Sequence, residues 1–254
     1  MADIRSSKVP QVTLVFWIIK IAATTLGETG GDALSMTFDL GYALSTAIFF
    51  VFFAGTVAAQ IRARSFHPFL YWAVIVATTT MGTTMADFAD RSLGIGYVGG
   101  SLILFALVML VLGIWWKVEG SVSVNAITSP RVEAFYWLTI LFSNTLGTAL
   151  GDFLADSGPG YEGGALVFAG LLAVVWALYA LTGMSRTLLF WAAFILTRPL
   201  GATVGDLLTK PTENGGLDLS RITSSAVIAV FIVACILILP QRAGRHPGAA
   251  REGG

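Results

Sequence analysis

One motif of constant spacing recurs four times along this chain of 254 residues. In each copy an aromatic residue and a tryptophan precede, with nine residues between, the pattern Gly-x-x-x-Gly/Ala-Asp. The copies are Phe16-Trp17 with Gly27, Gly31 and Asp32; Tyr71-Trp72 with Gly82, Ala86 and Asp87; Tyr136-Trp137 with Gly147, Gly151 and Asp152; and Phe190-Trp191 with Gly201, Gly205 and Asp206. Every copy lies in an apolar stretch. The fold must therefore accommodate four equivalent carboxylates in or beside a membrane, where acidic groups are costly and usually functional.

The composition is that of a membrane protein and excludes an ordinary soluble domain. Hydrophobic residues make up 56% of the chain and charged residues 12%, whereas soluble domains carry about 25% charged residues. The net charge is zero and no basic stripe is present, which argues against a nucleic-acid partner. The single cysteine, Cys235, stands in an apolar run, and His67 and His246 lie in a short loop and in the tail. Neither an internal disulfide nor a histidine metal site is expected.

Eight apolar stretches, each near the roughly 20 residues that a helix needs to cross the hydrocarbon, predict eight transmembrane helices. They cover residues 11–34, 40–61, 68–89, 96–117, 133–155, 163–184, 187–208 and 221–240. The odd-numbered helices carry the motif, so each repeat is expected to be a two-helix hairpin. The first stretch contains a motif copy and lacks a small-residue cleavage site, so we expect a retained helix and not a signal peptide. The predicted fold is an all-α integral membrane protein with a single domain, 1–254, of repeats 9–66, 67–118, 131–185 and 186–241, followed by a disordered cytoplasmic tail, 242–254.

The distribution of lysine and arginine predicts that both termini lie in the cytoplasm. The side that holds the N-terminus carries Arg5, Lys8, Arg62, Arg64, Lys117, Arg131, Arg186, Arg242, Arg245 and Arg251. The other side carries only Arg91, Lys210 and Arg221, and basic residues favour the cytoplasmic side. Because each repeat crosses twice, all four run the same way, as parallel repeats about an axis along the membrane normal. The motif aspartates are 55, 65 and 54 residues apart, and the longer middle interval, a polar linker from Lys117 to Arg131, indicates two duplicated halves.

Four tandem two-helix units, each with a tryptophan at a fixed place, resemble a bacterial integral-membrane family described only as carrying a repeat of unknown function. The resemblance covers nearly the whole chain, from about Val9 to Leu239. It implies an eight-helix protein of the bacterial cytoplasmic (inner) membrane. It implies little about activity, because the family was defined without an assigned substrate. The fourth repeat departs from the others, with Leu217 where Tyr42, Tyr97 and Tyr161 stand.

The small residues of the motif are interpreted as packing residues, because Gly-x-x-x-Gly spacing lets transmembrane helices approach closely. They are Gly27, Gly31, Gly82, Ala86, Gly147, Gly151, Gly201 and Gly205. This interpretation predicts a central bundle of the first, third, fifth and seventh helices, with the other four helices outside. The motif tryptophans are interpreted as an aromatic belt at the cytoplasmic membrane interface.

If the motif helices face one axis, equivalent residues form layers, and three of these layers are polar. The polar layers are Asp32, Asp87, Asp152 and Asp206; Glu28, Thr83, Thr148 and Ala202; and Thr24, Thr79, Asn144 and Arg198. Ile75, Ile140, Phe194 and Lys20 form the next layer toward the cytoplasm. Oxygen donors of this kind suit Mn²⁺, Mg²⁺, Ca²⁺, Na⁺ or protons. In the alternative interpretation the aspartates, near the outer ends of their helices, are either solvated residues at the mouth of the bundle or turn-starting residues that bond to nearby backbone.

Three charged residues occur in one repeat each, so the packing of the common unit does not require them. Arg198 stands one turn from the layer of Glu28, and its guanidinium is long enough to form a buried pair with that carboxylate. Lys20 lies near the middle of the membrane with no carboxylate within a turn of its layer. A buried lysine of this kind can be neutral and take up a proton. We treat Lys20 and Arg198 as buried basic or gating residues, and Glu28 and Asp32 as the primary metal candidates.

These residues predict a transporter of a small cation, with a divalent metal such as manganese, exchanged for protons, as the specific expectation. Glu28-Thr29-Gly30-Gly31-Asp32 is loosely similar to the acidic Glu-x-Gly-Asp motifs of divalent-cation/proton exchangers. Two alternatives stay open. Lys20 and Arg198 could bind an anionic or zwitterionic solute while the aspartates carry protons, or the chain could be a non-transporting partner or sensor subunit.

No catalytic residues and no cofactor are expected. The sequence contains no Gly-x-Ser-x-Gly elbow, no His-Glu-x-x-His helix and no nucleotide-binding glycine-rich loop. Apart from the cation or solute, the expected partner is the lipid bilayer, and the oligomeric state is left open, a homo-oligomer included.

Overall fold

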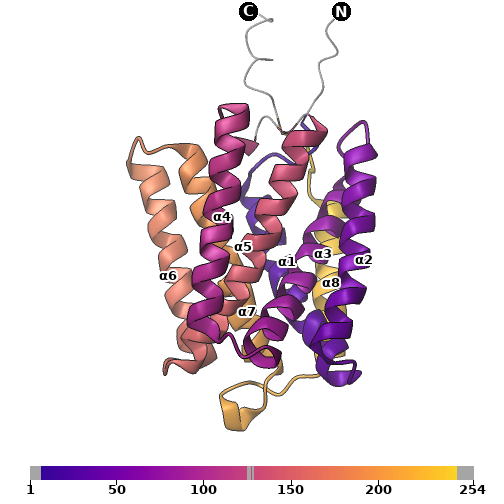
Figure 1. Ribbon diagram of the computed structural model, residues 1–254, viewed down its shortest axis with the longest axis vertical. Helices are drawn as coiled ribbons and strands as arrows, with labels where there is room; N and C mark the ends of the chain where they lie inside the picture. The colour runs from indigo at the N-terminus through magenta and orange to yellow at the C-terminus, as the bar shows by residue number, and fades with distance from the viewer. Residues whose placement is uncertain (1–6, 125–126, 128, 245–254) are drawn as a thin grey trace, which may run out of the picture.

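The structure of the chain, a computed structural model, describes residues 7–124, 127 and 129–244 and contains eight long α-helices in that part (Figure 1). They are α1 (Leu14–Asp32), α2 (Gly41–Arg62), α3 (Pro68–Asp87), α4 (Tyr97–Glu119), α5 (Pro130–Asp156), α6 (Gly160–Leu181), α7 (Arg186–Thr209) and α8 (Arg221–Ile238). A short 3₁₀ turn, η4 (Thr212–Asn214), lies in the loop between α7 and α8. The prediction of eight helices is confirmed, with boundaries within a few residues.

The largest boundary shifts follow from local capping chemistry. Helix α5 begins at Pro130, before the predicted residue 133, because Pro130 suits the first helical position and the hydroxyl of Ser129 accepts from the amide of Val132 at 3.3 Å. Helix α6 begins at Gly160 and ends at Leu181, three residues before the predicted range at both ends, because Thr182 adopts an extended conformation.

Helices α1 and α3 widen into a π-helical turn directly after the motif aspartate. The turns span Ala33–Thr37 after Asp32 and Phe88–Ser92 after Asp87. Such turns occur frequently at functional sites. Helices α5 and α7 continue as regular α-helix through Asp152 and Asp206, so the four motif copies differ in backbone at this point.

The four motif helices form a closed ring. Helix α1 packs against α3 and α7, and α5 packs against the same two neighbours. The other four helices lie outside this ring, and each packs chiefly on the motif helix of the following repeat: α2 on α3, α4 on α5, α6 on α7 and α8 on α1. The two helices of each repeat follow one another in the chain, as the prediction of two-helix hairpins requires, but the outer helix makes its main contacts with the next repeat.

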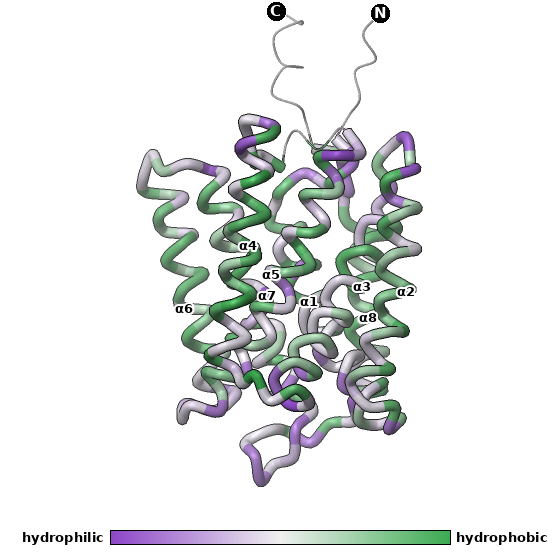
Figure 2. Tube along the Cα trace, viewed as in Figure 1, coloured by the Kyte–Doolittle hydropathy of each residue, from purple (hydrophilic) through white to green (hydrophobic). Residues whose placement is uncertain are grey.

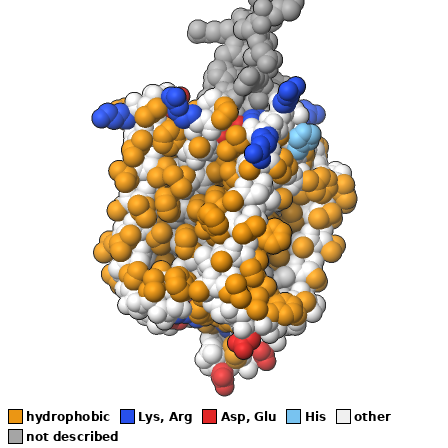
Figure 3. Space-filling model, turned by 45° about the vertical axis from the view of Figure 1, so that its right-hand side comes forward, with side chains coloured by type: hydrophobic (Ala, Val, Ile, Leu, Met, Phe, Trp, Pro, Cys, Tyr) orange, Lys and Arg blue, Asp and Glu red, His pale blue; other side chains and the backbone are white. Residues whose placement is uncertain are grey.

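Burial separates the ring from the outer helices. In the most apolar stretch of 18 residues of each helix, 72% of the residues are buried in α3 and in α5, against 11% in α2 and in α6. The outer helices are predominantly hydrophobic in Figure 2, and Figure 3 shows hydrophobic side chains spread over the wall of the molecule while Lys and Arg side chains gather near the end that holds the termini. Among the described residues, seven helices are long and apolar enough to cross a membrane. Helix α1 is not one of them, because Lys20, Glu28 and nearby threonines lower its hydropathy.

The glycines of the motif lie where neighbouring ring helices cross. A Cβ atom added at Gly27 would come within 2.4 Å of Thr79, and one at Gly201 within 2.2 Å of Thr24. The equivalent contacts of the two remaining crossings are Gly82 with Asn144 and Gly147 with Arg198. The absence of a side chain at these positions thus sets the short distance between ring helices.

At the upper end of the molecule, as oriented in Figure 1, three segments of the chain meet. The amide of Gln11 donates to the carbonyl of Arg242 at 2.8 Å, that of Gly244 to Val9 at 2.8 Å, and that of Lys8 to Ile127 of the central linker at 3.4 Å. Ile127 of the linker, which was expected to be a polar loop, thus contacts the segment around Lys8, and this segment in turn pairs with residues 242–244 at this end. Residues 242–244, expected to begin a disordered tail, pair with the N-terminal segment, and residues 245–254 lie outside the described part of the chain.

Candidate functional site

The four motif aspartates lie inside the molecule, in the lower half of the ring. Their exposed fractions are between 1% and 5% of the side chain's maximum: Asp32 1%, Asp87 2%, Asp152 5% and Asp206 3%. The alternative interpretation of the aspartates as solvated residues at the mouth of the bundle is therefore wrong, although Asp32 and Asp87 are the last residues of α1 and α3. Buried carboxylates are found paired, because an isolated buried charge is very costly.

Two basic residues bridge these aspartates in pairs. Arg91 Nε lies 3.0 Å from Asp87 Oδ1, and its Nη2 lies 3.4 Å from Asp152 Oδ2. Lys210 Nζ lies 2.7 Å from Asp32 Oδ2 and 3.1 Å from Asp206 Oδ1. Each basic residue thus holds the aspartate of its own repeat and that of the following repeat in the ring.

The basic residues occupy equivalent places in the sequence. Four residues after the motif aspartate stand Met36, Arg91, Asp156 and Lys210 in the four repeats. The second and fourth repeats supply the cations, so the two halves of the chain contribute one bridged pair each. Burial by itself lowers the pKa of Lys210, but the nearby charges of Asp206, Asp32 and Glu28 raise it by more than burial lowers it. The pKa of Lys210 therefore lies above its ordinary value, and the ammonium stays charged.

Glu28 and Arg198 form the buried ion pair that their spacing predicts. Arg198 Nη2 lies 3.0 Å from Glu28 Oε2, and both residues are almost completely buried. The hydroxyl of Thr83 donates to the same carboxylate oxygen at 3.2 Å and contacts the guanidinium, and Arg198 Nη1 donates to the carbonyl of Thr24 at 3.4 Å. This pair links α1, α3 and α7 across the ring.

Lys20 lies apart from the carboxylates, nearer the upper end. Its Nζ donates to Asn144 Oδ1 at 3.3 Å and stands 4.1 Å from the centre of the Phe194 ring, while Asn144 Nδ2 donates to the hydroxyl of Thr78 at 3.0 Å. Among the described residues no carboxylate pairs with Lys20. Thr79 donates to the carbonyl of Ala23 at 3.2 Å, so its hydroxyl serves the helix crossing.

Three carboxylates are close enough to share one cation. One oxygen each of Glu28, Asp32 and Asp206 lie within 4.8 Å of one another, and all three side chains are buried. Within the part of the chain that the structure describes, Asp32 Oδ1 has no hydrogen-bond partner. The sequence identified Glu28 and Asp32 as metal candidates, and the structure adds Asp206 to them. Asp87 and Asp152 belong instead to the pair held by Arg91.

A cavity of about 610 Å³ borders this ionic layer at the lower end of the molecule. Its lining includes the residue that stands four positions after the motif aspartate in each repeat: Met36, Arg91, Asp156 and Lys210. Tyr97, Tyr161 and Arg221 line it as well. Arg221, the first residue of α8, has its Nε 3.8 Å from Asp32 Oδ2. Tyr97 and Tyr161 come from the Gly-Tyr sequences that open α4 and α6. The basic side chains of Arg91, Lys210 and Arg221 thus lie between the cavity and the motif aspartates with which they pair.

Above the ionic layer, aromatic side chains fill the ring. Trp72, Trp137 and Trp191 are buried, and the hydroxyls of Tyr71 and Tyr136 are 2.7 Å apart. Trp191 Nε1 donates to the carbonyl of Val122 in the linker at 3.0 Å. Trp17, the motif tryptophan of the first repeat, is half-buried. The interpretation of the motif tryptophans as an aromatic belt at the membrane interface is therefore wrong for Trp72, Trp137 and Trp191, whose rings pack in the interior and close the upper end.

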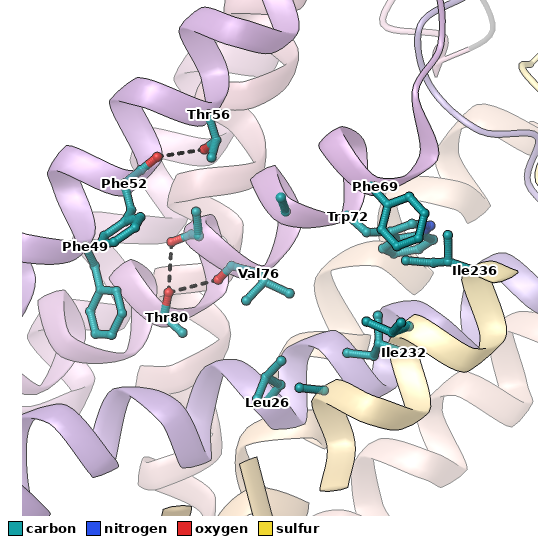
Figure 4. A pocket seen from close by; sticks show the side chains of 14 residues that line it. Leu26, Phe49, Phe52, Thr56, Phe69, Trp72, Val76, Thr80, Ile232 and Ile236 are labelled. Carbon is teal, nitrogen blue, oxygen red and sulfur yellow. Dashed lines mark hydrogen bonds between the residues drawn. The ribbon is translucent and has the colours of Figure 1, made fainter. Parts of the chain in front are cut away.

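A second hollow, of about 400 Å³, lies on the wall among α1, α2, α3 and α8 (Figure 4). Phe49 and Phe52 of α2, Trp72 and Val76 of α3 and Ile232 of α8 are among its lining residues. Its threonine hydroxyls donate to backbone carbonyls of their own helices: that of Thr56 to Phe52 at 2.8 Å and that of Thr80 to Val76 at 2.9 Å. This hollow offers no set of charged groups for a cation.

Sequence reasoning missed the cations of the site. The sequence pattern assigned three basic residues, Arg91, Lys210 and Arg221, only a role in membrane orientation. In the structure each of them lies within 4 Å of a motif aspartate. A signal was present, because residues four apart share a helix face and the Asp-x-x-x-Arg and Asp-x-x-x-Lys spacings place each pair side by side.

Comparison with known proteins gives a family and no activity. No curated protein and no solved structure matches the chain. The sequence model of a family described as a Repeat of Unknown Function (DUF347) matches four consecutive segments, residues 15–66, 70–121, 135–185 and 189–242. These segments cover most of the chain and coincide with the four copies of the motif. The chain belongs to this family of four-repeat proteins of unknown function.

Proposed function

We propose that this chain is a multi-pass integral membrane protein of the bacterial cytoplasmic membrane, with both termini in the cytoplasm. Seven long apolar helices and an outer wall of exposed hydrophobic side chains support the membrane location. Lys and Arg concentrate at the end that holds the termini, which supports the orientation. In this orientation the cavity opens away from the cytoplasm, and the four repeats run parallel around the ring.

Within the membrane the protein transports a small cation through the site formed by Glu28, Asp32 and Asp206. The observation that carries this proposal is the convergence of three buried carboxylates within 4.8 Å, with Asp32 Oδ1 unpartnered, beside a polar cavity. Carboxylate oxygens are the ligands that hard cations prefer. Intramembrane acidic groups of this kind mark ion pathways in other membrane proteins.

The charge balance of the site favours a cation as cargo. Glu28 and the four motif aspartates face Arg91, Arg198, Lys210 and Arg221. Five carboxylates against four basic side chains leave one negative charge uncompensated, which a proton or a metal cation neutralises. A divalent metal such as manganese, released in exchange for protons bound by the same carboxylates, is the specific reaction proposed.

A zwitterionic or anionic solute is the second candidate. The observation in its favour is the rim of the cavity, where Arg91, Lys210 and Arg221 stand together with the hydroxyls of Tyr97 and Tyr161. A solute carboxylate would bind at this rim while a solute ammonium reached the aspartates. A cationic cargo is preferred, because each of these three basic groups already lies within 4 Å of an aspartate.

Reconstituted protein tests the proposal. We expect proteoliposomes that contain the full chain to take up Mn²⁺ when a proton gradient is imposed, and the Glu28→Gln/Asp32→Asn variant to reduce uptake at least about tenfold by removing two ligand charges. Asp218→Asn, a change of an exposed loop residue, is the matched control and should transport normally. Absence of uptake for Mn²⁺, Mg²⁺, Ca²⁺ and Na⁺ by folded wild-type protein would rule out the cation transporter, and uptake of a zwitterionic amino acid instead would establish the second candidate. With neither, the non-transporting partner subunit is left.

A further inference from the structure

The two bridged aspartate pairs differ in the cation that holds them, and this difference bears on how the site takes up its cargo. We propose that Lys210 is a tethered cation that occupies the place of the transported ion and leaves it when a divalent cation binds. This inference rests on the proposed transport function and concerns the same site. Arg91, its equivalent in the other half of the chain, is a fixed structural bridge.

The chemistry of the two side chains separates these roles. Arg91 presents two different nitrogen atoms to its two aspartates, Nε to Asp87 and Nη2 to Asp152. A planar guanidinium that engages both partners holds them in one geometry. Lys210 instead presents a single ammonium to Asp32 and Asp206, and an ammonium is a compact point charge on a flexible stem. A metal ion can replace a point charge without remaking a planar contact.

The surroundings of the two pairs separate them as well. Glu28 brings a third carboxylate oxygen to the pair held by Lys210, and among the described residues this is the one cluster of three such ligands. Asp32 Oδ1, in a side chain that is 1% exposed, has no hydrogen-bond partner among residues 7–124, 127 and 129–244, so the cluster keeps an oxygen that Lys210 does not use. The pair held by Arg91 has no third carboxylate of this kind in the described chain.

Hydrogen bonds hold the backbone of Lys210, whereas its side chain lies beside a cavity that it can enter. The amide of Lys210 donates to Asp206 at 2.8 Å, and its carbonyl accepts from Asp218 at 3.0 Å. Gly216 packs so closely on it that an added Cβ atom would come within 2.0 Å of the Lys210 carbonyl oxygen. The side chain lines the cavity beside the ionic layer. Withdrawal of the ammonium into the cavity therefore requires rotation of one side chain and no movement of the loop.

The charge balance then selects a divalent cation. With Lys210 in place the layer lacks one positive charge, and with the ammonium withdrawn it lacks two. A divalent ion restores neutrality, whereas a monovalent ion leaves the buried layer charged, which is costly. After release of the divalent ion, return of Lys210 keeps the empty site from holding two unpaired carboxylates.

Binding and transport of Mn²⁺ by three variants test the role of Lys210. In Lys210→Gln the competing charge is gone, so we expect the Mn²⁺ affinity, measured by electron paramagnetic resonance of free ion, to rise at least about tenfold. Transport should fall in the same variant, because release is slowed. In Lys210→Arg the guanidinium should hold both aspartates, so binding and transport should both fall at least about tenfold. Lys117→Gln, which removes an exposed lysine from the opposite end, is the matched control.

Two results bear on different claims. If folded Lys210→Gln binds Mn²⁺ no more tightly than wild type, or if Lys210→Arg transports normally, Lys210 does not compete with the cargo and the inference is wrong, although transport itself stands. If wild-type protein neither binds nor transports Mn²⁺, and Lys210→Gln does not bind it either, the proposed divalent-cation function fails together with the inference.

Discussion

At the scale of single residues, the pair of Glu28 and Arg198 breaks the pseudo-symmetry of the ring. At the place of Arg198 the other repeats have Thr24, Thr79 and Asn144, whose polar groups bond across helix crossings. Glu28 stands where the neighbouring repeat has Thr83. Removing one member of a buried ion pair is strongly destabilising, because the other charge stays behind without a partner, whereas removing both is often nearly neutral. The pair is therefore expected to show strong energetic coupling.

A double-mutant cycle measures this coupling. Arg198→Met should lower the free energy of unfolding by about 3–5 kcal/mol, because it leaves Glu28 buried and unpaired. Glu28→Gln/Arg198→Met should recover more than half of that loss. Equilibrium unfolding of the purified protein in mixed micelles, followed by tryptophan fluorescence, gives the four free energies. Single effects that add within about 0.5 kcal/mol would show that the two side chains do not interact.

Part of this site was predictable from residue spacing, and part was not. The pairing of Glu28 with Arg198 followed from one helical turn of offset, because both residues lie in layers that repeat spacing defines. The burial of the aspartates did not follow, since Asp also serves as a solvated helix-end residue. The bridges from Arg91 and Lys210 depend on which helices are neighbours in the ring, and no local pattern states that order.

At the scale of helices, the packing unit is displaced from the sequence repeat by one helix. The repeat in sequence is a motif helix followed by an outer helix, but α2 packs chiefly on α3 and α8 closes the ring on α1. In a closed ring every outer helix has two candidate partners, its own motif helix and the next one. Self-similarity of the sequence establishes the number and order of units, and it does not state which of these two contacts is made. This explains why eight helices were predicted correctly while the main packing partner of each outer helix was not.

The motif glycines give a stability prediction at this scale. Gly201→Ala should lower the free energy of unfolding by about 1–3 kcal/mol, because the new methyl group would overlap Thr24 in α1 and push the ring helices apart. Gly55→Ala is the matched control: Gly55 lies within α2, and a Cβ atom added there would meet nothing within 4 Å. It should leave stability unchanged or raise it by about 0.5–1 kcal/mol through helix propensity.

The measurement is the same unfolding assay in micelles, with the two variants compared to wild type. Equal stability of Gly201→Ala and Gly55→Ala would contradict the close crossing of α1 and α7. The free energy and not the yield of protein is the quantity to compare, because expression of membrane proteins also responds to insertion.

At the scale of the whole molecule, the two ends are built differently. The lower end holds a polar cavity lined by the basic residues that pair with the motif aspartates, and the upper end is closed by aromatic side chains, the linker and both terminal segments. The cavity thus approaches the ionic layer from the lower end. The transport proposed above therefore predicts that the buried aromatic rings of Tyr71, Trp72, Tyr136, Trp137 and Trp191 separate to let a cation pass to the other side.

Cysteine labelling from one side of the membrane tests this asymmetry together with the proposed orientation. In a Cys235→Ser background, Asn214→Cys places a thiol in the exposed loop at the lower end and Met36→Cys places one on the wall of the cavity. A membrane-impermeant maleimide should label both in right-side-out spheroplasts, because the proposed orientation places the lower end away from the cytoplasm. Arg64→Cys, a change of an exposed residue near the upper end, should be labelled only after permeabilisation.

Two outcomes would contradict these expectations. Labelling of Arg64→Cys before Asn214→Cys would reverse the proposed orientation. Labelling of Asn214→Cys without labelling of Met36→Cys would show that the cavity is closed from that side.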